Sequence, residues 1–187
     1  HPKRQPHNLH PKKENQMNPK TVTGYRRPGS IRPVTASDDP VIANIIRVNL
    51  RTHHLDIPGT AYFDPELDHL SRYYALLPDK RKYFIAEDGD GHVIGGAGIA
   101  EFAGFDNCAE LQKLYVADSA KGNGIGKRLM LAAEDFACQA GYRRLYLETH
   151  SNLKTATGMY ERNGYRQIEK PESVLHPTMD RFYIKEL

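Results

Sequence analysis

Residues 121–126 read KGNGIG, and they lie between ELQKLYVADSA (110–120) and KRLMLAAEDFACQAG (127–141). The first flank has the pattern of a strand that ends at Val116, and the second has the period of an amphipathic helix. Backbone N–H groups at a helix start have no partner within the helix, and the helix dipole adds positive potential there. Glycines leave room for a ligand near these groups, so the stretch suits a phosphate group. A turn that merely needs glycine explains the spacing about equally well.

Two common phosphate-binding loops do not fit this stretch. A P-loop that ended at Gly126 would need glycine at position 121 and Ser or Thr at position 128, but these are Lys121 and Arg128. The dinucleotide fingerprint Gly-x-Gly-x-x-Gly fails as well, because Gly122, Gly124 and Gly126 are spaced two and two. The ligand is therefore expected to be neither a nucleoside triphosphate in a P-loop nor a dinucleotide.

The whole chain has the composition of a globular protein. Its 187 residues suit one domain, with 39% hydrophobic and 26% charged residues. No apolar run approaches the roughly 20 residues of a membrane helix, and no apolar signal core is visible near the N-terminus. Cys108 and Cys138 form no CxxC pair. We therefore expect no membrane segment, no metal site and a reducing, cytoplasmic setting.

Charge divides the chain into two parts. Residues 1–28 carry seven Lys or Arg and one acid, a net charge of +6 that leaves −3 for residues 29–187. We expect 1–28 to be a basic tail rich in Pro and His, with Met17 as a candidate native start, and 29–187 to be one domain. The mildly acidic body argues against nucleic-acid binding, although a basic tail that binds RNA is an alternative. If the tail is ordered it needs a neighbour such as a second subunit, so a homodimer stays open.

The hydrophobic pattern predicts a mixed sheet with helices on both faces. A short strand and then a turn are expected within SIRPVTASDD (30–39), before a helix near 39–52, and Asp64 before Pro65 indicates the start of a second helix. The remaining predicted elements are a hairpin turned by GDG at 89–91, a strand at 108–116, a helix from 125 to Gly141, a strand at 143–149, a helix that ends at Gly164, and two final strands.

The segment LYVADSAKGNGIGKRLM (114–130) resembles the acyl-CoA-binding motif of the GNAT superfamily of N-acetyltransferases. The family signature is Arg/Gln-x-x-Gly-x-Gly/Ala, which corresponds here to Lys121, Gly124 and Gly126. The resemblance extends over roughly residues 83–187. It implies the GNAT-type fold, a mixed, mostly antiparallel sheet of about seven strands with helices on both faces.

The resemblance also implies a function. A chain of this family is expected to transfer an acetyl group from acetyl-CoA to a primary amine, directly and within a ternary complex. The alternative is a catalytically silent module of the same fold that binds acyl-CoA or docks a partner. Small amines, amino acids, polyamines, antibiotics and protein amines all stay open as acceptors.

By resemblance, the coenzyme residues follow the strand and the loop. Backbone N–H groups of the loop, with Lys127, are expected to bind the pyrophosphate, and the strand before it to pair with the pantetheine arm. The expected coenzyme-binding residues are Leu114, Tyr115, Val116, Lys121, Gly122, Asn123, Gly124, Ile125, Gly126 and Lys127. The N–H of Val116 is also expected to stabilise the oxyanion of the transition state. The first motif position is Lys121 rather than Arg or Gln, which keeps the charge but loses the planar fork.

Two further side chains match catalytic positions of the family. Tyr160 corresponds to the tyrosine that donates a proton to the coenzyme sulfur, and packing in the core is the alternative role. Glu110, six residues before Val116, corresponds to a water-linked general base, with an edge salt bridge as an equal alternative. His150 and His176 are weaker base candidates. Leu153 stands where the family often has Asn, so a coenzyme contact by the adjacent Asn152 is doubtful.

Overall fold

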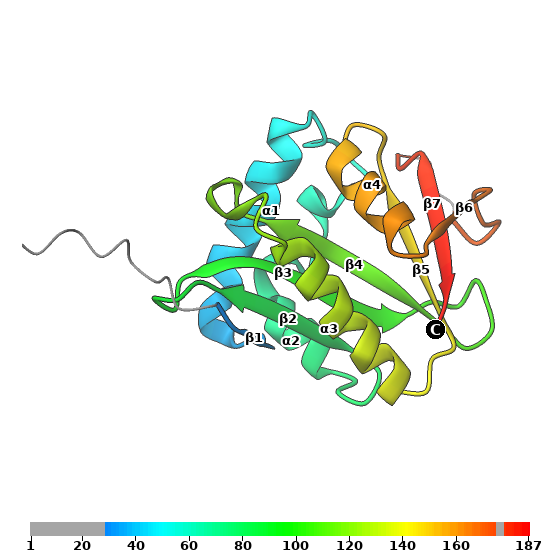
Figure 1. Cartoon of the computed structure of the whole chain (residues 1–187), viewed down its shortest axis with the longest axis horizontal. Helices are drawn as coiled ribbons and strands as arrows, with labels where there is room; N and C mark the ends of the chain where they lie inside the picture. The colour runs from blue at the N-terminus through cyan, green and yellow to red at the C-terminus, as the bar shows by residue number, and fades with distance from the viewer. Residues whose placement is uncertain (1–28, 175–177) are drawn as a thin grey trace, which may run out of the picture.

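The computed structural model describes residues 29–174 and 178–187 (Figure 1). Seven strands form one sheet in the order β1-β2-β3-β4-β5-β7-β6, in which only β4 and β5 run parallel. The strands are β1 (Ile31–Pro33), β2 (Lys82–Glu87), β3 (Val93–Glu101), β4 (Cys108–Val116), β5 (Arg144–Thr149), β6 (Arg166–Ile168) and β7 (Arg181–Glu186). The helices are α1 (Asp39–Thr52), α2 (Leu70–Ala75), α3 (Ile125–Gln139) and α4 (Lys154–Arg162). The predicted mixed, mostly antiparallel sheet of about seven strands is confirmed.

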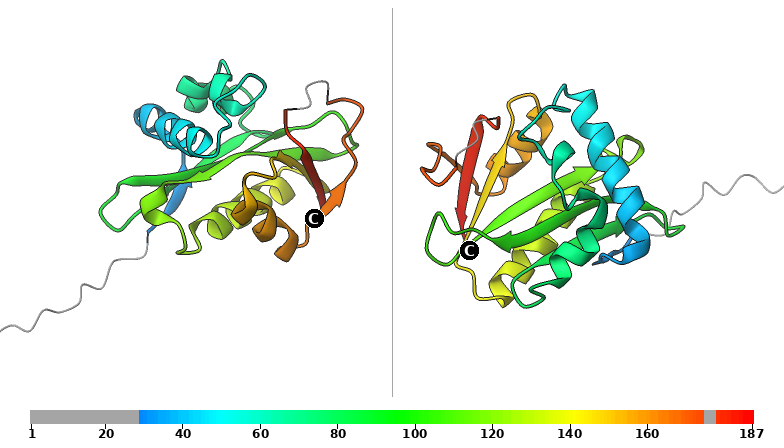
Figure 2. Two further views of the ribbon diagram at one scale, coloured as in Figure 1. Left: turned by 90° about the horizontal axis from the view of Figure 1, so that it is seen from above. Right: turned by 180° about the vertical axis from the view of Figure 1, so that it is seen from behind.

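Helices cover both faces of the sheet (Figure 2). Helices α1 and α2 pack on one face, where Ile42, Ile46 and Tyr74 are buried against β2 and β3. Helices α3 and α4 pack on the other face, where Leu129 and Tyr160 join the larger core. The site described below lies where these layers meet at the end of β4.

The sheet divides between β4 and β5. The two strands pair only from Cys108 to Glu110, opposite Arg144 to Tyr146. Beyond this point β4 carries a bulge at Lys113, whose φ is +49°, and the register with β3 shifts between Gly96 and Gly98. The hydroxyl of Tyr83 donates to the carbonyl of Lys113 at 2.8 Å and so fixes the bulge. A bulge increases local twist, which turns the end of β4 away from β5.

The predicted first helix at 39–52 is confirmed, and so is the α3 segment with Gly141 in the left-handed conformation at its end (φ +89°). The predicted start of a helix at Asp64 and Pro65 was wrong. Asp64 ends a short 3-10 turn, and α2 begins only at Leu70. The Asp64 carboxylate lies 2.7 Å from the Lys113 ammonium. This ion pair between distant segments therefore uses the side chain that the sequence pattern predicted to cap a helix.

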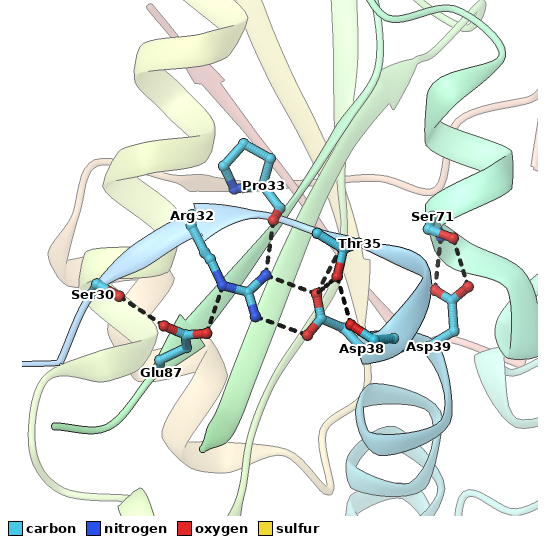
Figure 3. Close-up of polar contacts among 9 residues, drawn as sticks. Ser30, Arg32, Pro33, Thr35, Asp38, Asp39, Ser71 and Glu87 are labelled. Atoms are coloured by element: carbon cyan, nitrogen blue, oxygen red, sulfur yellow. Dashed lines mark hydrogen bonds and ion pairs between the residues drawn. The ribbon is translucent and has the colours of Figure 1, made fainter. Parts of the chain in front are cut away.

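A partly buried ion pair holds the start of α1 (Figure 3). The guanidinium of Arg32 donates to both carboxylate oxygens of Asp38 at 2.8 Å and to Glu87 at 2.6 Å. Asp39 then accepts from the backbone and hydroxyl of Ser71 on α2, at 2.9 and 2.6 Å. Strand β1 and helices α1 and α2 are therefore tied together by charged hydrogen bonds.

Replacing Asp38 by alanine is expected to lower the free energy of unfolding by about 2–4 kcal/mol, because it leaves the partly buried Arg32 guanidinium without its main partner. The Arg32 guanidinium lowers the pKa of Asp38 to about 2. The contribution of this carboxylate is therefore fully present above pH 4 and is lost as the pH falls from about 4 to 2.

Asp68→Ala is the matched control, since Asp68 makes the same two-pronged contact with Arg47 but its side chain is 56% exposed. Urea denaturation of this variant is expected to show a loss below about 1 kcal/mol. Equal losses for the two variants would contradict the assignment of Asp38 as an anchor of α1.

Candidate active site

A cavity of about 910 Å³ occupies the split between β4 and β5. The end of β4, the loop before α3, the start of α3, helix α4 and the last turns of α1 all contribute to its wall. Its lining residues are Asn49, His53, Leu114, Tyr115, Val116, Ala120, Lys121, Gly122, Gly124, Ile125, Gly126, Lys127, Asn152, Leu153, Lys154, Thr155, Ala156, Met159, Arg162 and Asn163.

The glycine-rich loop presents unpaired backbone donors to this cavity. Gly122 and Gly124 have φ of +80° and +73°, a conformation that favours glycine. Within the described part of the chain, the backbone N–H groups from Gly122 to Lys127 make no hydrogen bond, and the ladder of α3 begins with Arg128 donating to the carbonyl of Gly124. The loop therefore forms a cradle of free N–H groups at a helix N-terminus, an arrangement suited to phosphate oxygens.

Cationic side chains surround the cradle. Lys121 and Lys127 lie on the loop and α3, whereas Lys154 and Arg162 lie on α4 across the cavity. No Asp or Glu of the described residues lines the cavity. Lys121 is paired with Asp118 at 2.7 Å, so the other three basic side chains are better placed to meet a phosphate. The resulting field favours a polyanionic ligand such as coenzyme A.

The backbone of β4 offers a second set of donors. Ala117 donates to the carbonyl of Ile94 on β3 at 2.8 Å, and Tyr115 lies opposite Gly96 in the same pairing. Since alternate residues of a strand direct their N–H and C=O groups to opposite sides, those of Leu114 and Val116 face the split. An extended ligand arm in the cavity can therefore pair with β4 as an added strand.

Most of the expected coenzyme residues line this cavity. The exception is Asn123, whose side-chain amide donates to the carbonyls of Ala120 and Lys121 at 3.2 and 3.4 Å and so shapes the loop. Tyr160 and Glu110 do not line it either. The two predicted titratable groups therefore lie outside the lining of the cavity.

Tyr160 lies on α4 between residues that line the cavity and the aromatic core. The residue is 5% exposed, and its ring packs against Tyr165 and Tyr183, with centroids 5.6 and 6.2 Å away. Its hydroxyl has no hydrogen-bond partner among the described residues. It is nevertheless not fully enclosed, because among these residues the side-chain polar atom that is both fully enclosed and without a partner is Nε of Arg144. The Tyr160 hydroxyl therefore keeps some accessible surface. Burial raises its pKa above the ordinary value, which keeps it protonated.

Glu110 lies on the opposite face of β4, toward α2. Its neighbour Gln112 accepts from Tyr74 of that layer at 2.7 Å and donates to the Glu110 carboxylate at 3.1 Å. Burial raises the pKa of Glu110 to about 7, and the negative charge of Glu148 adds to the effect. A carboxylate with this pKa exchanges protons readily at neutral pH, as a general base must.

A group of charged residues surrounds Glu110. Burial raises the pKa of Glu148 on β5, which accepts from the hydroxyl of Tyr146 at 3.0 Å. Lys113 from the β4 bulge is only 7% exposed and contacts Asp64 at 2.7 Å and Glu66 at 3.3 Å. Asp64 and Glu66 therefore neutralise a buried lysine instead of starting a helix.

The remaining predicted candidates lie in loops. His150 accepts from the backbone of Asn152 at 3.0 Å and lies 3.8 Å from Asp180, so it organises the turn after β5. The Asn152 amide donates to the carbonyl of His53 at 3.0 Å and joins that turn to the end of α1. His176 lies outside the described residues, as does the tail at 1–28.

Several lining residues were not predicted from sequence. Asn49 lies on α1 and His53 directly follows that helix, about 70 residues before the loop, and no local pattern connects them to it. Lys154 and Arg162 both lie on α4. Their spacing of eight residues is just over two helical turns, so the sequence could have predicted that they lie near the same face of the helix. Glu148 does not line the cavity, but it follows Tyr146 by two residues on β5, and Tyr146 lies opposite Glu110 of β4.

The fold and the cavity define the class of protein. The profile of the Acetyltransferase (GNAT) family matches residues 48–165, which is more than half of the chain. The chain therefore belongs to the GNAT family and is an acetyl-CoA-dependent N-acetyltransferase. Among the described residues, none of the helices has the length and apolar character needed to cross a membrane.

Particular relatives agree with this assignment. The uncharacterized N-acetyltransferase YjgM of Escherichia coli is 36% identical over 141 residues, which cover 74% of this chain and 83% of YjgM. A GNAT-family acetyltransferase of Staphylococcus aureus superposes with a TM-score of 0.72 at 20% identity, over 84% of this chain and 98% of its own. The PaiA N-acetyltransferase of Thermoplasma acidophilum, solved in complex with coenzyme A, gives 0.65 at 20% identity, over 86% and 100%. The structural matches show the shared fold.

Proposed function

We propose that this enzyme transfers the acetyl group of acetyl-CoA directly to a primary amine while both substrates are bound. The observation that carries the proposal is the run of free N–H groups from Gly122 to Lys127 at the mouth of the split sheet. These groups, with Lys127, hold the pyrophosphate of the coenzyme. Leu114 and Val116 pair with its pantetheine arm through the free side of β4, and Tyr115 lies between them in the strand.

Proton transfer is assigned to the two groups beside the cavity. Glu110, acting through a water molecule, removes the proton that an ammonium acceptor must lose before attack. Tyr160 donates a proton to the departing thiolate, and the N–H of Val116 stabilises the charge that develops on the acetyl oxygen. Tyr160 belongs to the core on the α3–α4 face of the sheet, whereas Glu110 lies toward α2 on the other face. Base and acid therefore approach the reaction centre from opposite faces of β4.

A thiol-release assay with a panel of amines tests this function. The wild-type enzyme is expected to release coenzyme A from acetyl-CoA only when an accepted amine is present. The panel should include small amines, amino acids, polyamines, aminoglycosides and peptides with free N-termini or lysines. Calorimetric binding of acetyl-CoA without thiol release for any of these would instead support a silent acyl-CoA-binding module.

Gly124→Ala is expected to weaken acetyl-CoA binding about tenfold or more, because a methyl group there enters the phosphate cradle. Gly91→Ala is the matched control. Both glycines have positive φ, at +73° and +83°, and a Cβ at either one meets no atom within 4 Å. Both variants should therefore lose about 1 kcal/mol of stability through backbone strain. Titration calorimetry that finds equal coenzyme affinity in the two variants would exclude the cradle as the phosphate site.

A further inference from the structure

Helix α1 places an asparagine against the end of β4. Asn49 is 4% exposed, although asparagine is a poor helix former. Its Nδ2 donates to the carbonyl of Ile45 one turn earlier at 2.9 Å and to the carbonyl of Val116 at 3.1 Å. A helix on one side of the sheet is thereby bonded to the strand end that borders the coenzyme cavity.

The two bonds determine which way the Asn49 amide faces. Both partners are carbonyl oxygens, which only accept, so the atom they contact must be the NH₂ group. Both of its hydrogens are then used. The carbonyl oxygen Oδ1 is left with no donor among residues 29–174 and 178–187.

The free oxygen faces the cavity. Among the described residues, the side-chain polar atom that is both fully enclosed and without a partner is Nε of Arg144. Since Oδ1 of Asn49 also has no partner there, it must keep some accessible surface. Asn49 is otherwise buried and lines the coenzyme cavity, which is where that surface lies. A buried carbonyl oxygen without a donor is costly, and a ligand donor would relieve this cost.

We propose that Asn49 is a coenzyme-binding residue whose Oδ1 accepts a hydrogen bond from the pantetheine arm, while its Nδ2 fixes the carbonyl of Val116. The inference rests on the proposed binding of that arm along β4. The arm carries two amide N–H groups and one hydroxyl as donors. Because Nδ2 contacts the Val116 carbonyl, the adjacent Oδ1 lies beside the backbone that the arm must pair with. Asn49 then distinguishes ligands that carry the arm from those that end at the nucleotide.

Two ligands separate this role from a purely structural one. Coenzyme A carries the arm, whereas adenosine 3′,5′-bisphosphate has the nucleotide part without it. In Asn49→Leu and Asn49→Ala the Kd of coenzyme A is expected to rise about 5- to 10-fold, the range expected for one buried hydrogen bond. The Kd of the bisphosphate should stay within about twofold of the wild-type value. Thr52→Val is the control, because it removes an i−4 side-chain bond on the same helix, to Val48 at 2.8 Å, outside the cavity.

An independent measurement needs no variant. In the wild-type protein, the NMR signals of the Asn49 side-chain NH₂ group are expected to shift with coenzyme A and to remain in place with the bisphosphate. Equal weakening of both ligands in the variants, or an unchanged Kd for coenzyme A, would overturn the role of Asn49. Unmoved NH₂ signals would do the same. Failure of the wild-type protein to bind coenzyme A at all would instead contradict the proposed function.

Discussion

Tyr160→Phe is expected to lower kcat about 100-fold or more, the typical contribution of a general acid. The KM for acetyl-CoA should change by less than about twofold, because the ring that packs against Tyr165 and Tyr183 is retained. The lost hydroxyl has no protein partner among the described residues, so its removal breaks no structural hydrogen bond. Steady-state kinetics with the best amine from the thiol-release panel measures both constants.

Tyr165→Phe is the control for this experiment. It removes a hydroxyl from a neighbouring buried tyrosine, but that hydroxyl donates to Glu134 at 2.9 Å in the core. The expected result is a loss of about 1 kcal/mol in stability with kcat unchanged. If Tyr160→Phe also keeps the wild-type kcat, Tyr160 is a core residue and another group protonates the thiolate.

Glu110→Gln is the second large change, with kcat/KM expected to fall about 100-fold at pH 8. The base must be ionised to act, and the pKa of Glu110 is about 7. Wild-type kcat/KM should therefore rise with pH and level off above about pH 7 to 8. The variant should lose this limb, because glutamine does not titrate. A variant that retained the limb would assign it to another group, such as the acceptor amine.

Glu110→Gln is expected to increase stability, although it lowers activity. The pKa of Glu110 is raised from 4.5 to about 7 in the folded protein, so the folded state binds the proton more tightly than the unfolded chain. Stability therefore decreases as the pH rises from about 4.5 to 7. Glu110→Gln removes this cost and should raise the free energy of unfolding at pH 8 by about 1–2 kcal/mol, allowing for the partial exposure of the side chain. At pH 4 the two proteins should be nearly equal.

Local pattern was enough to predict most elements. The period around Leu129 and Gly141 specifies α3 because both its buried face and its end depend on residues close in sequence. The helix predicted at Asp64 failed because the carboxylate there pairs with Lys113, almost 50 residues away. Contacts at such separations leave no periodic signal in one sequence.

The local parts of the site could also be predicted from the sequence. The loop donors follow from glycine spacing and from the geometry of a helix start, both of which are local. Asn49 and Glu148 could not be found in this way, because each enters the site through packing of distant elements. Glu110 was located by family position, whereas its raised pKa depends on burial that only the folded chain reveals.

The split between β4 and β5 affects whether a strand edge of this protein can pair with other polypeptide chains. Strand edges with free N–H and C=O groups invite pairing with other chains, and proteins usually shield them. Here the edge at Leu114 and Val116, where only the Val116 carbonyl has a partner (Asn49), lies inside the sheet, and α1, α3 and α4 supply the cavity walls around it. A polypeptide strand brings side chains on both of its faces, whereas a pantetheine arm is thin and nearly unbranched. We therefore expect the cavity to accept a thin, extended ligand and to shield this strand edge from other proteins.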